Sequence, residues 1–162
     1  MQDALNKIRE FQRKHKFKIG VNLLDRTGVD SDLDRALMDF SSLLTDISEY
    51  LESRSGEDPR VLRAHLIAEE TAEIFAALSE RDEVELLDAL ADSIYVVAGT
   101  ATTFDLPLAE GFDAVHASNM LKAVRGQEDV RLRNKGEHWK APDLAKVLSD
   151  YRDGGDTAPE RV

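Results

Sequence analysis

Six acidic residues between positions 69 and 92 have the types and spacing to do chemistry. They are Glu69, Glu70, Glu73, Glu85, Asp88 and Asp92. The glutamates at 69–73 interrupt apolar stripes of helical spacing, and Glu85, Asp88 and Asp92 form a second stripe that ends at Tyr95. Carboxylates in such interior positions repel one another strongly unless a cation lies between them. Between Leu62 and Asp92 the only lysine or arginine residues are Arg63 and Arg81.

The spacing also predicts that the two acidic stripes face each other. A short turn at about 79–82 joins the two helices that carry them, so these helices must run antiparallel. Residues equally far from the turn lie at the same height, which pairs Glu73 with Asp88 and Glu70 with Asp92.

Such a set of carboxylates predicts a metal site. Oxygen ligands from Asp and Glu suit hard cations, so we expect Mg²⁺, with Mn²⁺ as a possible substitute. Two ions about 4 Å apart are compatible with this many ligands. The alternative is that all six are ordinary solvated residues, but their interruption of apolar stripes favours the metal.

The elements that must position these residues are helices. Apolar residues recur at intervals of three and four, which predicts an all-α fold, an antiparallel bundle of about five to six helices. We expect helices at about 2–15, 31–52, 59–78, 82–104, 107–126 and 142–151, and a loop or short hairpin at 127–140. Asp58 with Pro59, and Asp82, have the types of helix-start residues. We expect one domain over residues 1–152 and a flexible tail over 153–162.

The predicted fourth helix has a core stripe beside its acidic one. Its members follow the spacing 3, 4, 3, 4, 3 and are Leu87, Leu90, Ile94, Val97, Ala101 and Phe104.

Composition limits the classes of protein. The chain has 162 residues, no cysteine and a formal net charge of −11. Without cysteine there is no disulfide framework and no thiolate metal site. An acidic protein is a poor nucleic-acid binder, because such binding relies on a basic face. We see no signal peptide and no apolar run long enough to span a membrane, so we expect a cytoplasmic protein without a membrane partner.

A second group of polar residues forms candidate substrate contacts. The stripe Leu108, Phe112, Val115 continues onto Asn119 and Lys122, which predicts either a pocket mouth or a solvated helix end. Arg125, one turn on, fits both interpretations. Lys135 and Trp139 lie in the predicted loop, where the tryptophan would either fill a core gap or stack on a base. Tyr95 would border the ligand or pack between helices.

Three motifs resemble one family. Glu69-Glu70-x-x-Glu73 with Glu85-x-x-Asp88 and Asp92 is similar to the signature of the MazG-like all-α nucleoside triphosphate pyrophosphohydrolases. The segment from His116 to Lys122 resembles the SNMxK segment of that superfamily, and 135–144 resembles the KGxxWxxPDL tail of its single-domain members. Either Glu85 with Asp88 or Asp88 with Asp92 is the second acidic pair.

The resemblance implies Mg²⁺-dependent cleavage of a nucleoside triphosphate between its α- and β-phosphates, in nucleotide-pool house-cleaning. It also implies homodimers or homotetramers. In this interpretation Glu70 or Glu73, whichever is not fully engaged as a ligand, accepts a proton from the attacking water. Alternatives are a dUTP-specific or phosphoribosyl-ATP-type member of the superfamily, or a helical dimerisation module without activity.

Overall fold

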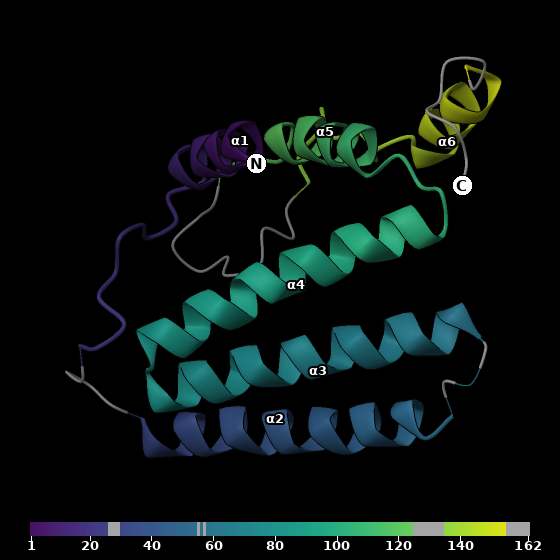
Figure 1. Ribbon diagram of the computed structural model, residues 1–162. Helices are drawn as coiled ribbons and strands as arrows, with labels where there is room; N and C mark the ends of the chain where they lie inside the picture. Colours follow the sequence, from purple (N-terminus) through teal and green to yellow (C-terminus); the bar gives the residue numbers. More distant parts are fainter. Residues whose placement is uncertain (26–29, 55, 57, 125–134, 155–162) are drawn as a thin grey trace. The chain divides into compact units, whose positions relative to one another are not determined.

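The computed structural model describes residues 1–25, 30–54, 56, 58–124 and 135–154, and these form six helices and no strand (Figure 1). The predicted all-α fold is therefore confirmed. The helices are α1 (Gln2–Lys14), α2 (Ser31–Glu52), α3 (Pro59–Glu80), α4 (Glu83–Thr103), α5 (Leu108–Met120) and α6 (Leu144–Asp153). No helix in these ranges is long and apolar enough to cross a membrane.

Short acidic side chains fix where the three longest helices begin. Asp30 accepts hydrogen bonds from the backbone amides at the start of α2, and Asp58 does the same for α3, whose first residue is Pro59. At α4, Asp82 accepts from the amides of Val84 and Glu85. Such caps pair amides that the helix itself leaves unpaired. The predicted helix starts at Pro59 and after Asp82 are confirmed.

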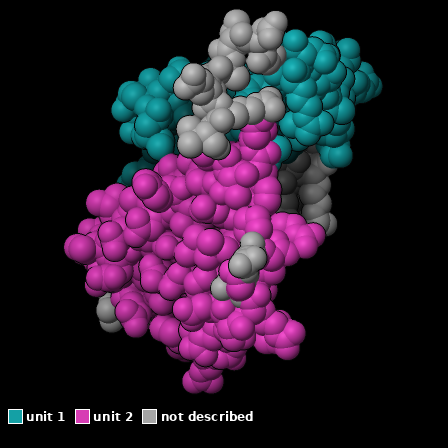
Figure 2. Space-filling model, turned by 45° about the vertical axis from the view of Figure 1, so that its right-hand side comes forward, with its two compact units in different colours: residues 1–21, 106–162 teal, residues 22–105 magenta. Residues whose placement is uncertain are grey.

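The chain divides into two compact units (Figure 2). Unit 1 contains residues 1–21 and 106–162, with α1, α5 and α6, and unit 2 contains residues 22–105, with α2, α3 and α4. In unit 2, α3 lies between α2 and α4 and contacts both of them (Figure 1). The turn between α3 and α4 passes through Arg81, which adopts the left-handed conformation with φ of 58°. All six carboxylates lie in unit 2.

The buried apolar residues in the described part of unit 2 are small. They are Ala68, Ala72, Ala77, Ala89, Val96 and Ala101. Alanines let helix backbones approach closely, so α3 and α4 pack through a narrow seam.

The predicted core stripe of α4 is wrong except at Ala101. Leu87 is 71% exposed, and Leu90, Ile94, Val97 and Phe104 are also exposed. The face of α4 that meets α3 carries the smaller Ala89 and Val96 instead. The spacing identified these residues as an apolar stripe but could not show which neighbour would cover it. No described helix of unit 2 covers this stripe.

Helix α5 in unit 1 ends earlier than predicted, at Met120 and not near Gly126. The Nζ of Lys14, at the end of α1, donates a hydrogen bond to the carbonyl of Met120. A lysine bound to a terminal carbonyl stabilises a helix end. The prediction of Lys122 as a helical residue is therefore wrong. Helix α6 begins at Leu144, with Asp143 as its cap, two residues later than predicted.

Of the polar residues that the structure describes, His15 is the most deeply buried, with no exposed surface. Neither of its ring nitrogens makes a hydrogen bond of good geometry with the described residues, although backbone groups of Asn119 and Ala123 lie near enough to oppose part of the fall in its pKa. Burial lowers the pKa of the His15 imidazole below its usual value, and the positive charges of Lys14 and Lys122 act in the same direction. His15 is therefore neutral in the folded protein at neutral pH.

We expect His15 to make the protein less stable in acid. As the pH falls below about 6.5, His15 binds a proton in the unfolded state but not in the folded state. The free energy of unfolding therefore decreases progressively below this pH. Between pH 7.5 and 5.5, urea unfolding should show that wild type loses on the order of 1 kcal/mol more than His15→Leu. His138→Leu, at an exposed position, serves as the control and should behave like wild type. Equal losses in His15→Leu and wild type would contradict this role.

Candidate active site

The two acidic stripes lie near each other on α3 and α4, but the expectation that all six carboxylates are interior is wrong. Only Glu70 is half-buried, and the other five are exposed because the two helices contact each other mainly through small residues. Burial raises the pKa of the Glu70 carboxyl, and the negative charges of Glu73, Asp92, Glu69 and Asp88 raise it further. Burial likewise raises the pKa of Glu73, followed by the charges of Glu69, Asp88, Asp92 and Glu85. Both glutamates therefore hold their protons more tightly than ordinary carboxyls do.

Both aspartates of α4 act on both glutamates of α3. The charges of Asp88 and Asp92 raise the pKa of Glu70 and that of Glu73. The pairing of Glu70 with Asp92 and of Glu73 with Asp88 stays a prediction.

Glu85 lies at the edge of this group. It has the weakest of the four effects on the pKa of Glu73, and it is not among the main causes of the shift at Glu70. Its backbone amide donates to Asp82 at the start of α4. Of the two acidic pairs left open by the sequence, Asp88 with Asp92 is the one whose two members both raise the pKa of both glutamates. Which pair is functional stays a prediction.

One observation among these residues favours a bound cation. One carboxylate oxygen of Glu70, Oε2, is buried and has no hydrogen-bond partner among the described residues. A buried, unpaired carboxylate oxygen among like charges is unfavourable unless a positive ligand compensates it. Across the described residues, no three His, Asp or Glu side chains already form an arrangement that could hold a metal ion. The ligand roles of the acidic residues therefore stay predictions.

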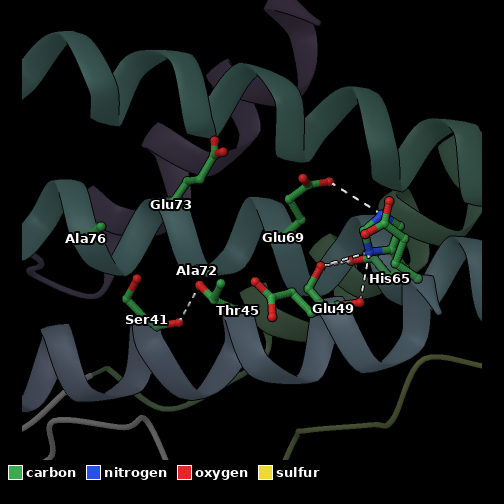
Figure 3. A pocket seen from close by; sticks show the side chains of 10 residues that line it. Ser41, Thr45, Glu49, His65, Glu69, Ala72, Glu73 and Ala76 are labelled. Carbon is green, nitrogen blue, oxygen red and sulfur yellow. Dashed lines mark hydrogen bonds and ion pairs between the residues drawn. The ribbon is translucent and has the colours of Figure 1, made fainter.

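A polar groove borders this group between α2 and α3 (Figure 3). Its volume is about 360 Å³. Glu69 and Glu73 line it from α3 and point to the same side of that helix, while Glu49 and Glu52 line it from α2. His65, also in the lining, places its Nε2 3.8 Å from the Oε2 of Glu69.

The α2 side of this groove was missed from the sequence. The buried hydroxyl of Ser48 lies 2.8 Å from the Nδ1 of His65, which orients the imidazole ring. The signal was a polar stripe along α2 with the spacing 4, 3, 4, running through Ser41, Thr45, Ser48 and Glu52. A polar stripe on one helix normally indicates a face in contact with solvent, so the sequence alone does not show that another helix packs beside it.

The predicted substrate contacts are divided between the units. Tyr95 is on α4 in unit 2 and is 81% exposed, so it does not pack between helices. Asn119 lies near the end of α5 and Lys122 in the turn after it, both in unit 1 and both half-buried. Arg125 lies outside the described residues. Their contacts with substrate stay predictions.

Lys135 and Trp139 contact each other in unit 1. The Nζ of Lys135 lies 3.9 Å from the centre of the Trp139 ring, so a cation–π contact occupies one face of the indole. The indole Nε1 is buried without a hydrogen-bond partner in the described part of the chain. Trp139 is half-buried, intermediate between the two predicted roles of core residue and stacking platform.

Comparison with known proteins identifies the family of the chain. The sequence profile of the family described as phosphoribosyl-ATP pyrophosphohydrolase matches residues 39–119, half of the chain. The match includes α3, α4, all six carboxylates and Asn119. Searches of curated proteins and of solved structures give no match. The chain belongs to the phosphoribosyl-ATP pyrophosphohydrolase family, within the MazG-like all-α nucleoside triphosphate pyrophosphohydrolase superfamily.

Proposed function

We propose that this pyrophosphohydrolase cleaves nucleoside triphosphates between the α- and β-phosphates in a Mg²⁺-dependent reaction. The observation that carries the proposal is the meeting of Glu70 and Glu73 with Asp88 and Asp92 across one seam, where burial and like charge raise the glutamate pKa values. The Oε2 of Glu70, buried without a hydrogen-bond partner among the described residues, supports the proposal that a cation binds there.

The residues that would hold Mg²⁺ are carboxylates of α3 and α4. They are Glu69, Glu70, Glu73, Asp88 and Asp92, with Glu85 at the edge. When bound, Mg²⁺ or Mn²⁺ would offset the charge of the phosphate oxygens and polarise the phosphoryl group. This also explains how a protein of net charge −11 accepts an anionic substrate.

The chain itself supplies the base. Glu70 or Glu73 accepts a proton from water as the water oxygen bonds to phosphorus, and the bridging bond between the α- and β-phosphates breaks. The products are a nucleoside monophosphate and pyrophosphate. A raised pKa brings a glutamate nearer to the operating pH, which suits a group that first takes up a proton and then releases it.

A second candidate substrate is phosphoribosyl-ATP, because the matching family carries that description. It offers the same bond to be cut. We would assay pyrophosphate release from canonical and damaged nucleoside triphosphates, dUTP and phosphoribosyl-ATP, each with Mg²⁺ and with Mn²⁺. Release from triphosphates supports the first candidate, and release from phosphoribosyl-ATP alone supports the second. A protein inert on all of them would contradict both and favour a dimerisation module.

We also propose that the protein is a homo-oligomer. The large apolar residues predicted as the core stripe of α4 are exposed, namely Leu87, Leu90, Ile94, Val97 and Phe104. We call them the aliphatic stripe of α4. A second exposed stripe on α2 follows helical spacing and contains Phe40, Leu43, Ile47 and Tyr50. Large exposed apolar stripes are typical of surfaces that another chain covers.

The assembly can be tested on the α4 stripe. We expect Leu90→Glu with Ile94→Glu to lower the mass measured by light scattering to that of one chain, because charges at an apolar contact oppose association. Val21→Glu, at an exposed position of unit 1, should leave the mass unchanged. A wild-type protein of 18.1 kDa at all concentrations would refute the oligomer.

A further inference from the structure

Arg63 on α3 has an unused positive charge in the α3–α4 seam. Its side chain is half-buried, and its Nε is buried without a hydrogen-bond partner among the described residues. Its Nη1 lies over Gly99 of α4, only 3.0 Å from the point where a Cβ on that glycine would stand. The missing side chain of Gly99 thus makes the room that the guanidinium occupies.

Two other arginines of unit 2, Arg60 and Arg81, have carboxylate partners. Arg81 binds Asp34 with an N–O distance of 2.8 Å, and Arg60 binds Asp58 at 2.6 Å. Within the described ranges, no carboxylate pairs with Arg63, although the chain has 32 acidic residues. A partly desolvated guanidinium is unfavourable without an anion, so this one is suited to an anion that the protein itself does not supply.

Arg63 lies on the same side of the seam as the acidic residues. Glu70 is seven residues further along α3, and Asp92 is seven residues before Gly99 on α4. Seven residues are almost two complete helical turns, so Arg63 and Glu70 share a face, as do Gly99 and Asp92. The backbones of the two levels are roughly 10 Å apart along the helices. A ligand held at the carboxylates can therefore extend toward the guanidinium.

We propose that Arg63 binds a phosphate group of the substrate that lies away from the bond being cut. This inference rests on the proposed function, because the carboxylates must hold the reacting phosphates. A guanidinium presents a planar fork that matches phosphate oxygens bidentately. Two phosphates have this chemistry: the terminal phosphate of a nucleoside triphosphate, and the phosphate of the phosphoribosyl group in phosphoribosyl-ATP.

The test compares Arg63→Gln with Arg60→Gln. Both variants remove one positive charge from α3, but Arg60 is an exposed residue at the helix start. We would measure KM and kcat with a nucleoside triphosphate, the matching diphosphate and phosphoribosyl-ATP. Arg63→Gln should raise KM about tenfold for substrates that carry the bound phosphate, with little change in kcat, because the lost contact is equal in ground and transition states.

The three substrates show which phosphate Arg63 binds. A rise in KM for the triphosphate but not for the diphosphate identifies the terminal phosphate. A rise for phosphoribosyl-ATP alone identifies the phosphoribosyl phosphate. If Arg63→Gln matches Arg60→Gln on all three substrates, the inference is wrong while the proposed function stands.

Two further measurements separate failure of this inference from failure of folding or of the proposed function. Gly99→Ala should keep the fold, since alanine favours helices. Its methyl group should displace the guanidinium of Arg63, so this variant should raise KM as Arg63→Gln does. Calorimetric binding of inorganic tripolyphosphate with Mg²⁺ needs no turnover, so it decides the role of Arg63 even if wild type hydrolyses no nucleotide. Wild type should bind about tenfold more tightly than Arg63→Gln, and equal affinity overturns the inference.

Discussion

Glu73→Gln is expected to lower kcat by about 10³-fold, within the range that a positioned general base contributes. The same result is expected for Asp92→Asn, because both carboxylates lie in one electrostatically coupled group. Glutamine and asparagine keep the shape of the side chain but remove its charge. Pyrophosphate release under saturating substrate measures the effect.

The folded state should survive this loss of activity. Glu73 is raised in pKa by burial and by neighbouring negative charge, so removing its charge relieves repulsion in the metal-free protein. Glu73→Gln should therefore melt at or above the wild-type temperature without metal. Glu80→Gln, an exposed residue at the end of α3, is the matched control and should be fully active. Full activity in Glu73→Gln would remove that residue from the catalytic group.

Removal of divalent ions is the second change with a large expected effect. Exhaustive chelation should abolish turnover, because the substrate and the six carboxylates are then both anionic with no cation between them. Adding back Mg²⁺ should restore full activity, and Mn²⁺ should restore part or all of it, since both accept octahedral oxygen ligands. The measurement is pyrophosphate release at constant ionic strength, with K⁺ in place of the divalent ion as control. Unchanged turnover in excess chelator would show that the carboxylates act without a metal.

The sequence predicted the helices that carry the carboxylates well because their starts and direction depend on local rules. Asp58 and Asp82 start α3 and α4, and a short turn forces the two helices antiparallel. Each step involves residues close together in the chain, and a helix fixes their faces through its constant turn.

The predictions that were wrong concern features that depend on residues far away in the chain. The end of α5 is set in part by Lys14, whose bond to Met120 spans 106 positions. The aliphatic stripe of α4 was correctly recognised as apolar, but periodicity does not say which surface covers it. The polar stripe that contains Ser48 was not identified from the sequence, because its partner His65 lies on another helix. The unpaired guanidinium of Arg63 likewise requires Gly99, from the next helix, to be understood.

Thermal melting with and without Mg²⁺ tests the central claim most directly, because it detects a cation between α3 and α4 without a known substrate. At Mg²⁺ concentrations about 100-fold above Kd, binding to the folded state should raise the wild-type Tm by roughly 5–10 °C. Glu80→Gln should show the same rise, and Glu73→Gln and Asp92→Asn should show little or none. A wild-type Tm that does not respond to Mg²⁺ or Mn²⁺, or an equal rise in all four proteins, would contradict a metal site formed by these carboxylates.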